Sequence, residues 1–343
     1  MDALRLGLAA STAALFLAPA IAAAAPQVVV SIKPIHSLVA SIMKGVGEPS
    51  LIVEGAASAH TYTLKPSNAR ALENADLVFW VGPGLEAFLT KPLETLPAKA
   101  KIVDLDDVDG LTKLTFREGG AFEAHDHGEH GEGEAHDEHG HDSAEAEHAP
   151  EAEPAEEHGH EEHEHHGEHE HGGTDMHLWL DPANAKAMAG AIAKHLAAVD
   201  PDNAPTYEAN ARTLEAEIDT LDAEIKTTVA PVLDTPFVVF HDAYQYFEKR
   251  YQVRVAGSIT VSPETMPGAE RLSEMHAKIK ELKAACVFAE PQFEPRLIKV
   301  VTEGTNAKTG TLDPEGGALT EGPELYGQLM RNLATSMVDC LGQ

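Results

Sequence analysis

Histidine side chains give this sequence its most evident capacity for chemistry. The stretch HGHEEHEHHGEHEH at 158–171 alternates imidazoles with carboxylates and contains no apolar residue. Such a stretch cannot form a hydrophobic core, but its side chains can bind metal ions. It belongs to a polar insert, residues 123–173, that holds 14 of the 20 histidines. The first question is therefore whether this insert is the main metal site or an accessory to another.

All fourteen histidines of the insert are candidate accessory ligands. The acidic residues among them keep the local charge negative, which attracts cations. The insert is low in complexity and has no periodicity, so we expect it to be disordered without metal. The accessory histidines are His125, His127, His130, His136, His139, His141, His148, His158, His160, His163, His165, His166, His169 and His171.

Three of the six remaining histidines have ordinary structural contexts. His195 and His276 lie in helical segments beside the apolar stripes, which predicts solvated helix faces. His36 lies in KPIHSL at the start of a helical segment, where a cap or a local hydrogen bond is expected. None of these contexts indicates a metal ligand.

The other three histidines share a different position. His60 lies in the loop after an apolar run, His177 comes directly before a helical segment, and His241 follows the run FVVF. Asp313, in TLDP, also follows an expected strand. Ligands of open α/β sheets bind beyond the carboxyl ends of the strands. These four side chains are therefore the candidates for one shared site.

Length, composition and charge limit the classes of protein to which this chain can belong. The chain has 343 residues, enough for one large domain or two ordinary ones, and a formal net charge of −31. The insert holds 19 of the 56 acidic residues and no Lys or Arg, so the rest of the chain carries −12. Because nucleic acids and anionic membranes bind basic surfaces, we expect neither as a partner.

The N-terminus has the pattern of an export signal. Arg5 precedes an apolar run from Leu6 to Ala25 that ends in small residues. This predicts a signal peptide cleaved near Ala23–Ala25 and a mature protein that is soluble and exported to the periplasm. The alternative is a transmembrane anchor.

The chain has two cysteines, Cys286 and Cys340. An even number of cysteines in an oxidising compartment favours a disulfide, with two buried free thiols as the alternative.

Short apolar runs alternate with helical segments on both sides of the insert. The expected strands are 27–32, 50–53, 76–81 and 101–105 before it, and 237–240, 253–259, 286–289 and 309–312 after it. This alternation predicts an α/β fold of two lobes, each with a mostly parallel four-stranded sheet. The expected organisation is a signal peptide at 1–25, a first lobe at 26–200 with the insert at 123–173, a long helix at 201–230 and a second lobe at 231–343.

Helical periodicity is clearest after the insert. Asp181 and Pro182 have the residue types of a helix cap and first position. The apolar stripe Tyr207, Leu214, Ile218, Leu221, Ile225 and Val229 then predicts a helix about 35 Å long. Periodicity alone leaves open whether it crosses between the lobes or lies along one of them.

Several motifs of the chain are specific in combination. They are GAASAHTYTLKPSNARALENADLVFWVGPGLEAFL, MHLWLDPANA, FHDAYQYFEKRYQ, GSIT with SPE, and TLDPEGG. With these motifs the chain resembles the periplasmic zinc-binding receptors of ABC-type zinc importers, from residue 26 to the end. The resemblance includes a His- and acid-rich insertion between the first and second histidine ligands.

The resemblance implies two α/β lobes joined by a long, rigid helix, with metal in the cleft between them. It gives His60, His177 and His241 the roles of first, second and third ligand. Asp313 matches a carboxylate that completes the site in some relatives, especially manganese receptors. Zinc-preferring relatives use water or a Glu directly before the first histidine, and Ala59 stands at that position here. The fourth ligand is thus open between water and Asp313.

The resemblance also bears on covalent structure and partners. It implies a Cys286–Cys340 disulfide, as in zinc-type members. It implies zinc as the bound ion, a membrane permease as the docking partner, a monomeric receptor and a periplasmic zinc chaperone as a further candidate partner.

The chemistry of three imidazoles favours zinc. Three neutral imidazoles and one oxygen make a tetrahedral zinc site, whereas manganese prefers more oxygen ligands; copper and nickel would also bind. A manganese or other divalent-metal receptor is one alternative. A three-His zinc hydrolase, with Glu54 or Asp313 as base, is another, but HExxH and GxSxG are absent from the sequence. An adhesin or a metal buffer is a third class.

We expect the insert to be an antenna that gathers several zinc ions weakly and passes them to the central site. Ordering a flexible loop costs roughly 1–2 kcal/mol per residue, so its affinity per ion should be below that of a preformed cleft. The alternative is a solvated insert with incidental metal binding.

Overall fold

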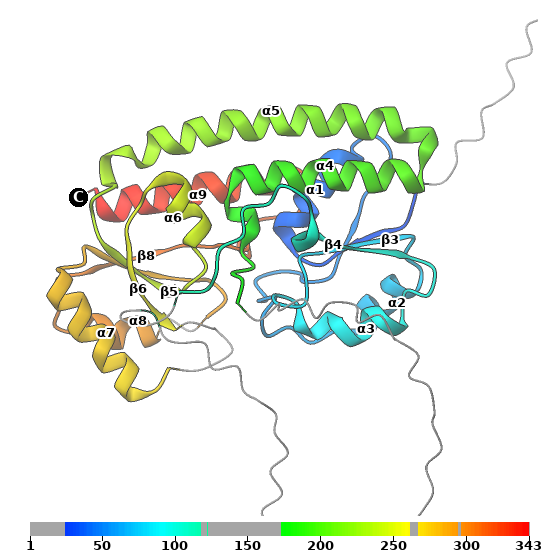
Figure 1. Cartoon of the computed structure of the whole chain (residues 1–343). Helices are drawn as coiled ribbons and strands as arrows, with labels where there is room; N and C mark the ends of the chain where they lie inside the picture. The colour runs from blue at the N-terminus through cyan, green and yellow to red at the C-terminus, as the bar shows by residue number, and fades with distance from the viewer. Residues whose placement is uncertain (1–24, 118–121, 123–172, 261–266, 294–295, 343) are drawn as a thin grey trace, which may run out of the picture.

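The computed structural model describes residues 25–117, 122, 173–260, 267–293 and 296–342, which form two α/β lobes side by side (Figure 1). The segment 1–24, with the predicted signal peptide, and residues 123–172, with all fourteen accessory histidines, lie outside the described residues. Among the described residues, no helix is both long and apolar enough to cross a membrane.

The first lobe is built on a parallel sheet of four strands in the order β2–β1–β3–β4. The central strands are apolar throughout because helices and loops cover both faces of a parallel sheet; Val28, Val29 and Val30 are all buried. The strands are β1 (Val28–Val30), β2 (Ser50–Leu51), β3 (Leu77–Trp80) and β4 (Lys101–Asp104). The helical elements of this part are α1 (Lys33–Met43), α2 (Pro66–Glu73), η1 (Ala87–Leu89), α3 (Thr90–Thr95) and η2 (Leu105–Asp107).

The second lobe repeats the same topology, with parallel strands in the order β6–β5–β7–β8. Its strands are β5 (Phe237–His241), β6 (Val255–Thr260), β7 (Cys286–Ala289) and β8 (Lys308–Thr311). Its helices are α6 (Gln245–Tyr251), α7 (Ala269–Leu282), α8 (Arg296–Thr302) and α9 (Leu325–Leu341). All eight strands lie within two residues of the bounds expected from the sequence, and the two-lobe α/β fold is confirmed.

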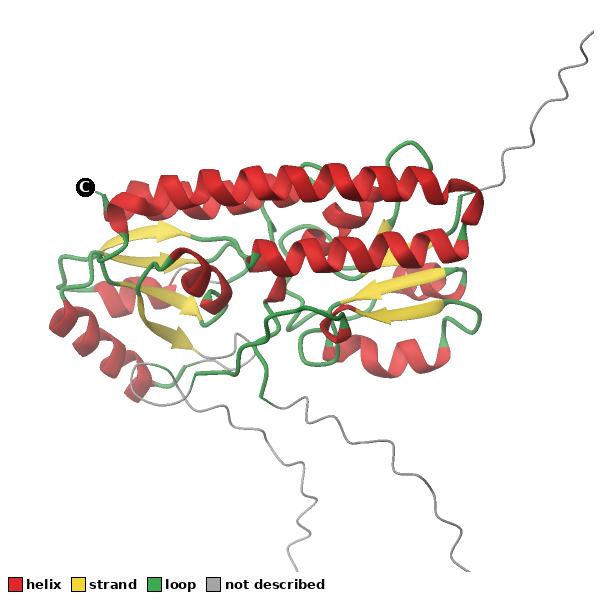
Figure 2. Ribbon diagram, turned by 45° about the horizontal axis from the view of Figure 1, so that its top comes forward, coloured by secondary structure: helices red, strands yellow, loops and turns green. Residues whose placement is uncertain are grey.

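Two long helices extend beside the sheets (Figure 2). The first is α4 (Pro182–Val199), preceded by η3 (Leu178–Leu180); the second is α5 (Ala204–Val229), flanked by η4 (Pro201–Asn203) and η5 (Ala230–Val232). Asp181 caps α4 as predicted, because its side chain accepts the N–H of Ala183 at 2.9 Å, and Pro182 takes the first helical position.

Helix α5 crosses between the lobes. It contacts α1 and α4 of the first lobe and α9 and α6 of the second, and Figure 1 shows it running along both. Every residue of its predicted apolar stripe, from Tyr207 to Val229, is buried. On α4, Met188, Ile192 and Leu196 lie at helical spacing and are buried, whereas Val199 is 37% exposed because the helix ends there.

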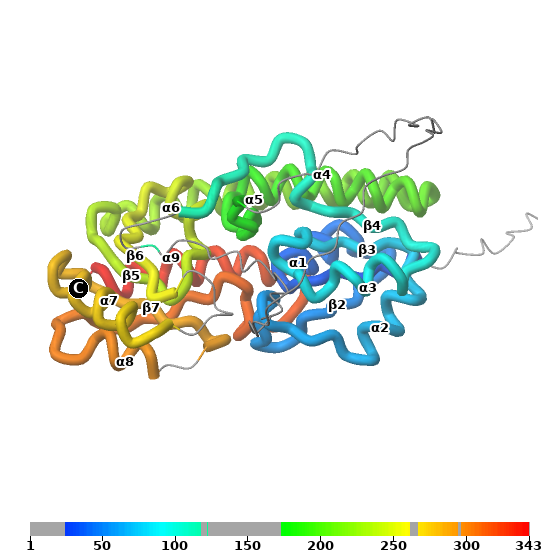
Figure 3. Tube along the Cα trace, turned by 60° about the horizontal axis from the view of Figure 1, so that its bottom comes forward, coloured from blue at the N-terminus to red at the C-terminus, as the bar shows by residue number. Residues whose placement is uncertain are grey.

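A second connection crosses between the lobes near the base of the insert. Residues 108–117 follow η2 and run toward α6 (Figure 3). The N–H of Leu114 donates to the Tyr246 hydroxyl at 3.0 Å, and the Arg117 guanidinium pairs with Asp242 and Glu248. The second lobe therefore holds this connection at Leu114 and Arg117.

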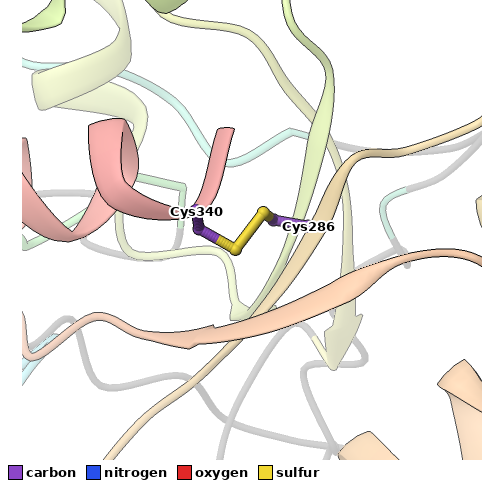
Figure 4. Close-up of a disulfide and its surroundings, with 2 residues drawn as sticks. All are labelled: Cys286 and Cys340. Atoms are coloured by element: carbon purple, nitrogen blue, oxygen red, sulfur yellow. A yellow bond between two sulfur atoms is a disulfide. The ribbon is translucent and has the colours of Figure 1, made fainter. Parts of the chain in front are cut away.

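Cys286 and Cys340 form a disulfide, with a Cα–Cα distance of 6.1 Å. It joins β7 to the last turn of α9 (Figure 4). The predicted pairing is confirmed, and it ties the C-terminal helix to the second sheet.

Candidate metal centre

Three histidine side chains converge between the two lobes. His60, His177 and His241 each present one ring nitrogen, and these nitrogens all lie within 4.8 Å of one another. The Nε2 atom of His177 lies 3.3 Å from that of His60 and 3.2 Å from that of His241. The sequence separates these residues by 117 and 64 positions, so only the tertiary fold brings them together.

Each histidine comes from a different local structure. His60 lies in the loop between β2 and α2, His177 directly precedes η3, and His241 is the last residue of β5. β5 lies between β6 and β7, and its carboxyl end opens toward the other lobe, where the topology of an open α/β sheet favours a ligand site. The three side chains thus meet between the lobes at the carboxyl end of β5, although only His241 itself ends a strand.

Buried carboxylates orient two of the imidazoles. The Nδ1 atom of His177 lies 2.7 Å from Oδ1 of Asp175, and the Nδ1 atom of His241 lies 2.7 Å from Oε1 of Glu290. When the Nδ1–H of a neutral imidazole donates to a carboxylate, its Nε2 is left with a free lone pair. Both Nε2 atoms then point lone pairs at the same space, which is unfavourable unless a cation lies between them.

Further bonds fix these carboxylates in turn. Asp175 accepts the N–H of His177 at 3.0 Å and the Gln245 side-chain amide at 3.1 Å. The Tyr244 hydroxyl donates to Glu290 at 3.3 Å. The acids are 0% and 3% exposed respectively. The orientation of the two rings is therefore set by the buried protein around them.

The spacing fits a tetrahedral ion. Zinc–nitrogen bonds of about 2.0–2.1 Å at tetrahedral angles put ligand nitrogens about 3.3 Å apart. The two Nε2 distances around His177, 3.2 and 3.3 Å, match this edge length. Two of the three rings are buried and the third, that of His60, is half-buried.

The electrostatics differ among the ligands. Burial, with the neighbouring His177 and His241, lowers the pKa of His60 well below its usual 6.5, which keeps this ring neutral and able to bind a cation. Burial also acts to lower the pKa of His241, but the charge and hydrogen bond of Glu290 outweigh it and the pKa is raised. Burial raises the pKa of Glu315, beside the His60 loop, to about 7.

Asp313 is placed differently from the three histidines. It is not part of the cluster that they form. Its Oδ1 accepts the N–H of Gly317 at 2.9 Å and the Gln292 amide at 3.0 Å, and its Oδ2 accepts the N–H of Ala318 at 2.9 Å. Both oxygens are therefore used to hold the loop that follows β8.

The three remaining histidines lie apart from this cluster. His36 binds the Pro49 carbonyl through Nε2 at 3.1 Å, a partner 13 residues along the chain and therefore less local than its context predicted. His276 binds the Val301 carbonyl through Nδ1 at 3.1 Å, and His195 lies half-buried on α4. These two rings are less solvated than the sequence indicated because neighbouring elements cover one side of each helix.

Sequence reasoning did not identify Asp175 and Glu290. Glu290 directly follows β7, so the strand-end rule that selected His241 would also have selected it. Asp175 stands two residues before His177, directly after the insert, so the sequence does not distinguish it from the many acidic residues of the insert.

Known zinc-uptake proteins are similar to this chain over nearly its whole length. The family described as "Zinc-uptake complex component A periplasmic" matches residues 28–340. The chain is 55% identical over 339 residues to the high-affinity zinc uptake system protein ZnuA of Brucella suis biovar 1, covering 98% of each chain. It is 38% identical over 328 residues to the ZnuA of Yersinia pestis, covering 96% of this chain and 95% of that protein. A crystal structure of ZnuA superposes with a TM-score of 0.69 at 25% identity, covering 92% of this chain and 99% of the other. The chain belongs to the ZnuA family of zinc-uptake components.

Proposed function

We propose that this protein captures Zn²⁺ in the periplasm and delivers it to the membrane permease of an ABC importer. The observation that carries this function is the convergence of His60, His177 and His241, with the Nε2 atom of His177 at the edge length of a tetrahedral zinc site from those of the other two rings. The relatives named as high-affinity zinc uptake proteins support zinc over manganese, as does the predominance of nitrogen ligands.

A water molecule is the fourth ligand in this proposal. Asp313 accepts hydrogen bonds at both oxygens, from Gly317, Gln292 and Ala318, so its recruitment to the metal would break contacts that hold the loop. Water needs no such rearrangement and completes a site with three protein ligands.

The protein acts as a binding protein and not as an enzyme. Three histidines and a water could support hydrolysis, but the two buried acids beside them are hydrogen-bonded to ring nitrogens. These acids serve to orient ligands, and membership of a zinc-uptake family supports transport. A periplasmic chaperone that supplies zinc is compatible with the same role.

The His-rich insert is an accessory in this proposal. It gathers zinc weakly and feeds the central site, whose described ligands need none of the insert's histidines. Described residues on either side of the insert lie close to that site: Arg117 pairs with Asp242, next to His241, and Asp175 binds His177. Ions released by the insert would therefore be released near the cleft.

Metal titration with elemental analysis tests the proposal. The full chain should bind one Zn²⁺ tightly and several weakly. The triple variant His60→Ala, His177→Ala, His241→Ala should keep only weak binding, while the control His195→Ala, His276→Ala keeps the tight ion. Deletion of 123–173 should lower the stoichiometry and leave the tight ion.

Two results would count against this division of roles. A tight ion that persists in the triple variant would place the main site elsewhere. Loss of the tight ion on deletion of the insert would make the insert part of that site.

A further inference from the structure

The loop after β8, residues 313–319, reaches from the second lobe to the first. Gly317 approaches the first lobe so closely that a Cβ there would lie 3.0 Å from the Cα of Ala56. Asp313 holds the turn by accepting the N–H groups of Gly317 and Ala318. The loop is thus a shaped element packed against the segment that leads to His60.

Two buried ionisable side chains fasten this loop across the lobes. Lys33, at the start of α1, is 4% exposed and donates to the carbonyls of Leu319 at 2.7 Å, Gly317 at 3.2 Å and Gly316 at 3.4 Å. From the loop itself, Glu315 reaches back to the first lobe. It is 5% exposed, and its Oε2 accepts the N–H of Ala59 at 3.1 Å.

Glu315 also contacts the backbone of His60 indirectly, through the side chain of Ser58. The Ser58 hydroxyl donates to Oε1 of Glu315 at 3.4 Å, and its oxygen accepts the N–H of His60 at 3.3 Å. His177 and His241 are oriented through their rings by buried acids. The His60 loop, in contrast, receives these two carboxylate contacts from the opposite lobe.

We propose that Glu315 is a positioning residue for His60 and, with Lys33, forms a latch that couples closure of the two lobes to completion of the metal site. This inference rests on the proposed function, because it assigns the latch to the three-His centre. When the lobes part, Ala59 and Ser58 lose their carboxylate partner and His60 loses its support. The latch therefore controls how fast a bound ion leaves.

The direct test is release of Zn²⁺ from the full chain into excess chelator, followed by stopped flow. Weak insert sites empty in a fast phase and the central site in a slow phase. Glu315→Ala should raise the slow-phase rate by about 10–100-fold, the range for loss of a group that orients a ligand, and should leave its amplitude at one ion per chain. Lys33→Met should act in the same direction. The exposed Glu324→Ala is the matched control and should release zinc as the native chain does.

Two further variants separate positioning from general destabilisation. Glu315→Gln keeps one acceptor oxygen, so its release rate should lie between those of the native chain and Glu315→Ala. In a Ser58→Ala background, Glu315→Ala should have a smaller effect than in the native chain, because part of its action passes through Ser58. If the effects of the two substitutions were additive, Glu315 would not act on His60 through Ser58.

The outcomes distinguish the latch from the site itself. A slow phase that disappears in His177→Ala but is unchanged in Glu315→Ala overturns the latch and leaves the zinc site standing. A slow phase that survives in the triple histidine variant overturns the proposed function itself.

Discussion

The Nε2 atoms of His177 and His241 lie 3.2 Å apart, and the Nδ1–H of each ring donates to a buried acid, Asp175 for His177 and Glu290 for His241. Removing a carboxylate that orients a metal-binding histidine typically costs 10–100-fold in affinity. Glu290→Gln and Asp175→Asn should therefore each weaken Zn²⁺ binding at the tight site by about that factor. Competition with a chelator of known affinity measures the change. The exposed Glu303→Gln serves as the control, and unchanged affinity in both buried variants would mean that neither acid sets a ligand's orientation.

The role of Asp313 can be tested against that of a histidine ligand. The oxygens of Asp313 hold Gly317 and Ala318 and are not part of the histidine cluster. Asp313→Asn should therefore reduce zinc affinity by no more than about tenfold, the lower end of the range for loss of a group that orients a ligand. His177→Ala, measured in the same competition assay, should cost far more. Equal losses in the two variants would identify Asp313 as a ligand.

Much of this architecture could be predicted from the sequence because it depends on local pattern. The buried strands, the Asp181 cap and the stripe on α5 follow from periodicity and turn chemistry. The cross-lobe contacts could not be predicted in this way. Glu315 reaches Ala59 over 256 residues of chain, and nothing in its neighbours in the sequence encodes that partner. Asp313 shows the same limit: its strand-end position made it a candidate ligand, but nothing in the sequence indicates that its carboxylate accepts the N–H groups of Gly317 and Ala318.

The disulfide should contribute strongly to stability. It closes a loop with a sequence separation of 54 residues between β7 and α9, which corresponds to about 4 kcal/mol on the chain-entropy model. The Cys286→Ala, Cys340→Ala variant should lose about that free energy of unfolding in urea, measured on metal-free protein. Native protein treated with a reductant should show the same loss, and the variant should not respond to the reductant. A loss below about 1 kcal/mol would show that α9 is held by its apolar contacts alone.

Glu86 should make stability depend on pH. Its side chain is fully buried and accepts hydrogen bonds from Ser31, Val81 and Gly82, which join the ends of β1 and β3. Burial, opposed by these hydrogen bonds, raises its pKa from 4.5 to about 7. The unfolded chain ionises this carboxyl near pH 4.5, whereas the folded chain keeps the proton until about pH 7. The contribution of Glu86 to the free energy of unfolding is therefore greatest below pH 4.5. It declines by about 3 kcal/mol in total between pH 4.5 and pH 7 and is constant above pH 7.

Comparison with Glu86→Gln isolates this dependence from that of other carboxyl groups. The free energy of unfolding of the native chain minus that of the variant should fall as the pH rises from 5 to 7 and then level off. Urea unfolding of metal-free protein at several pH values measures the difference, with chelator present so that zinc binding does not contribute. A difference that rises with pH over this range would mean that the ionised carboxylate is the form that the fold stabilises. The three donors from Ser31, Val81 and Gly82 would then outweigh the cost of burying its charge.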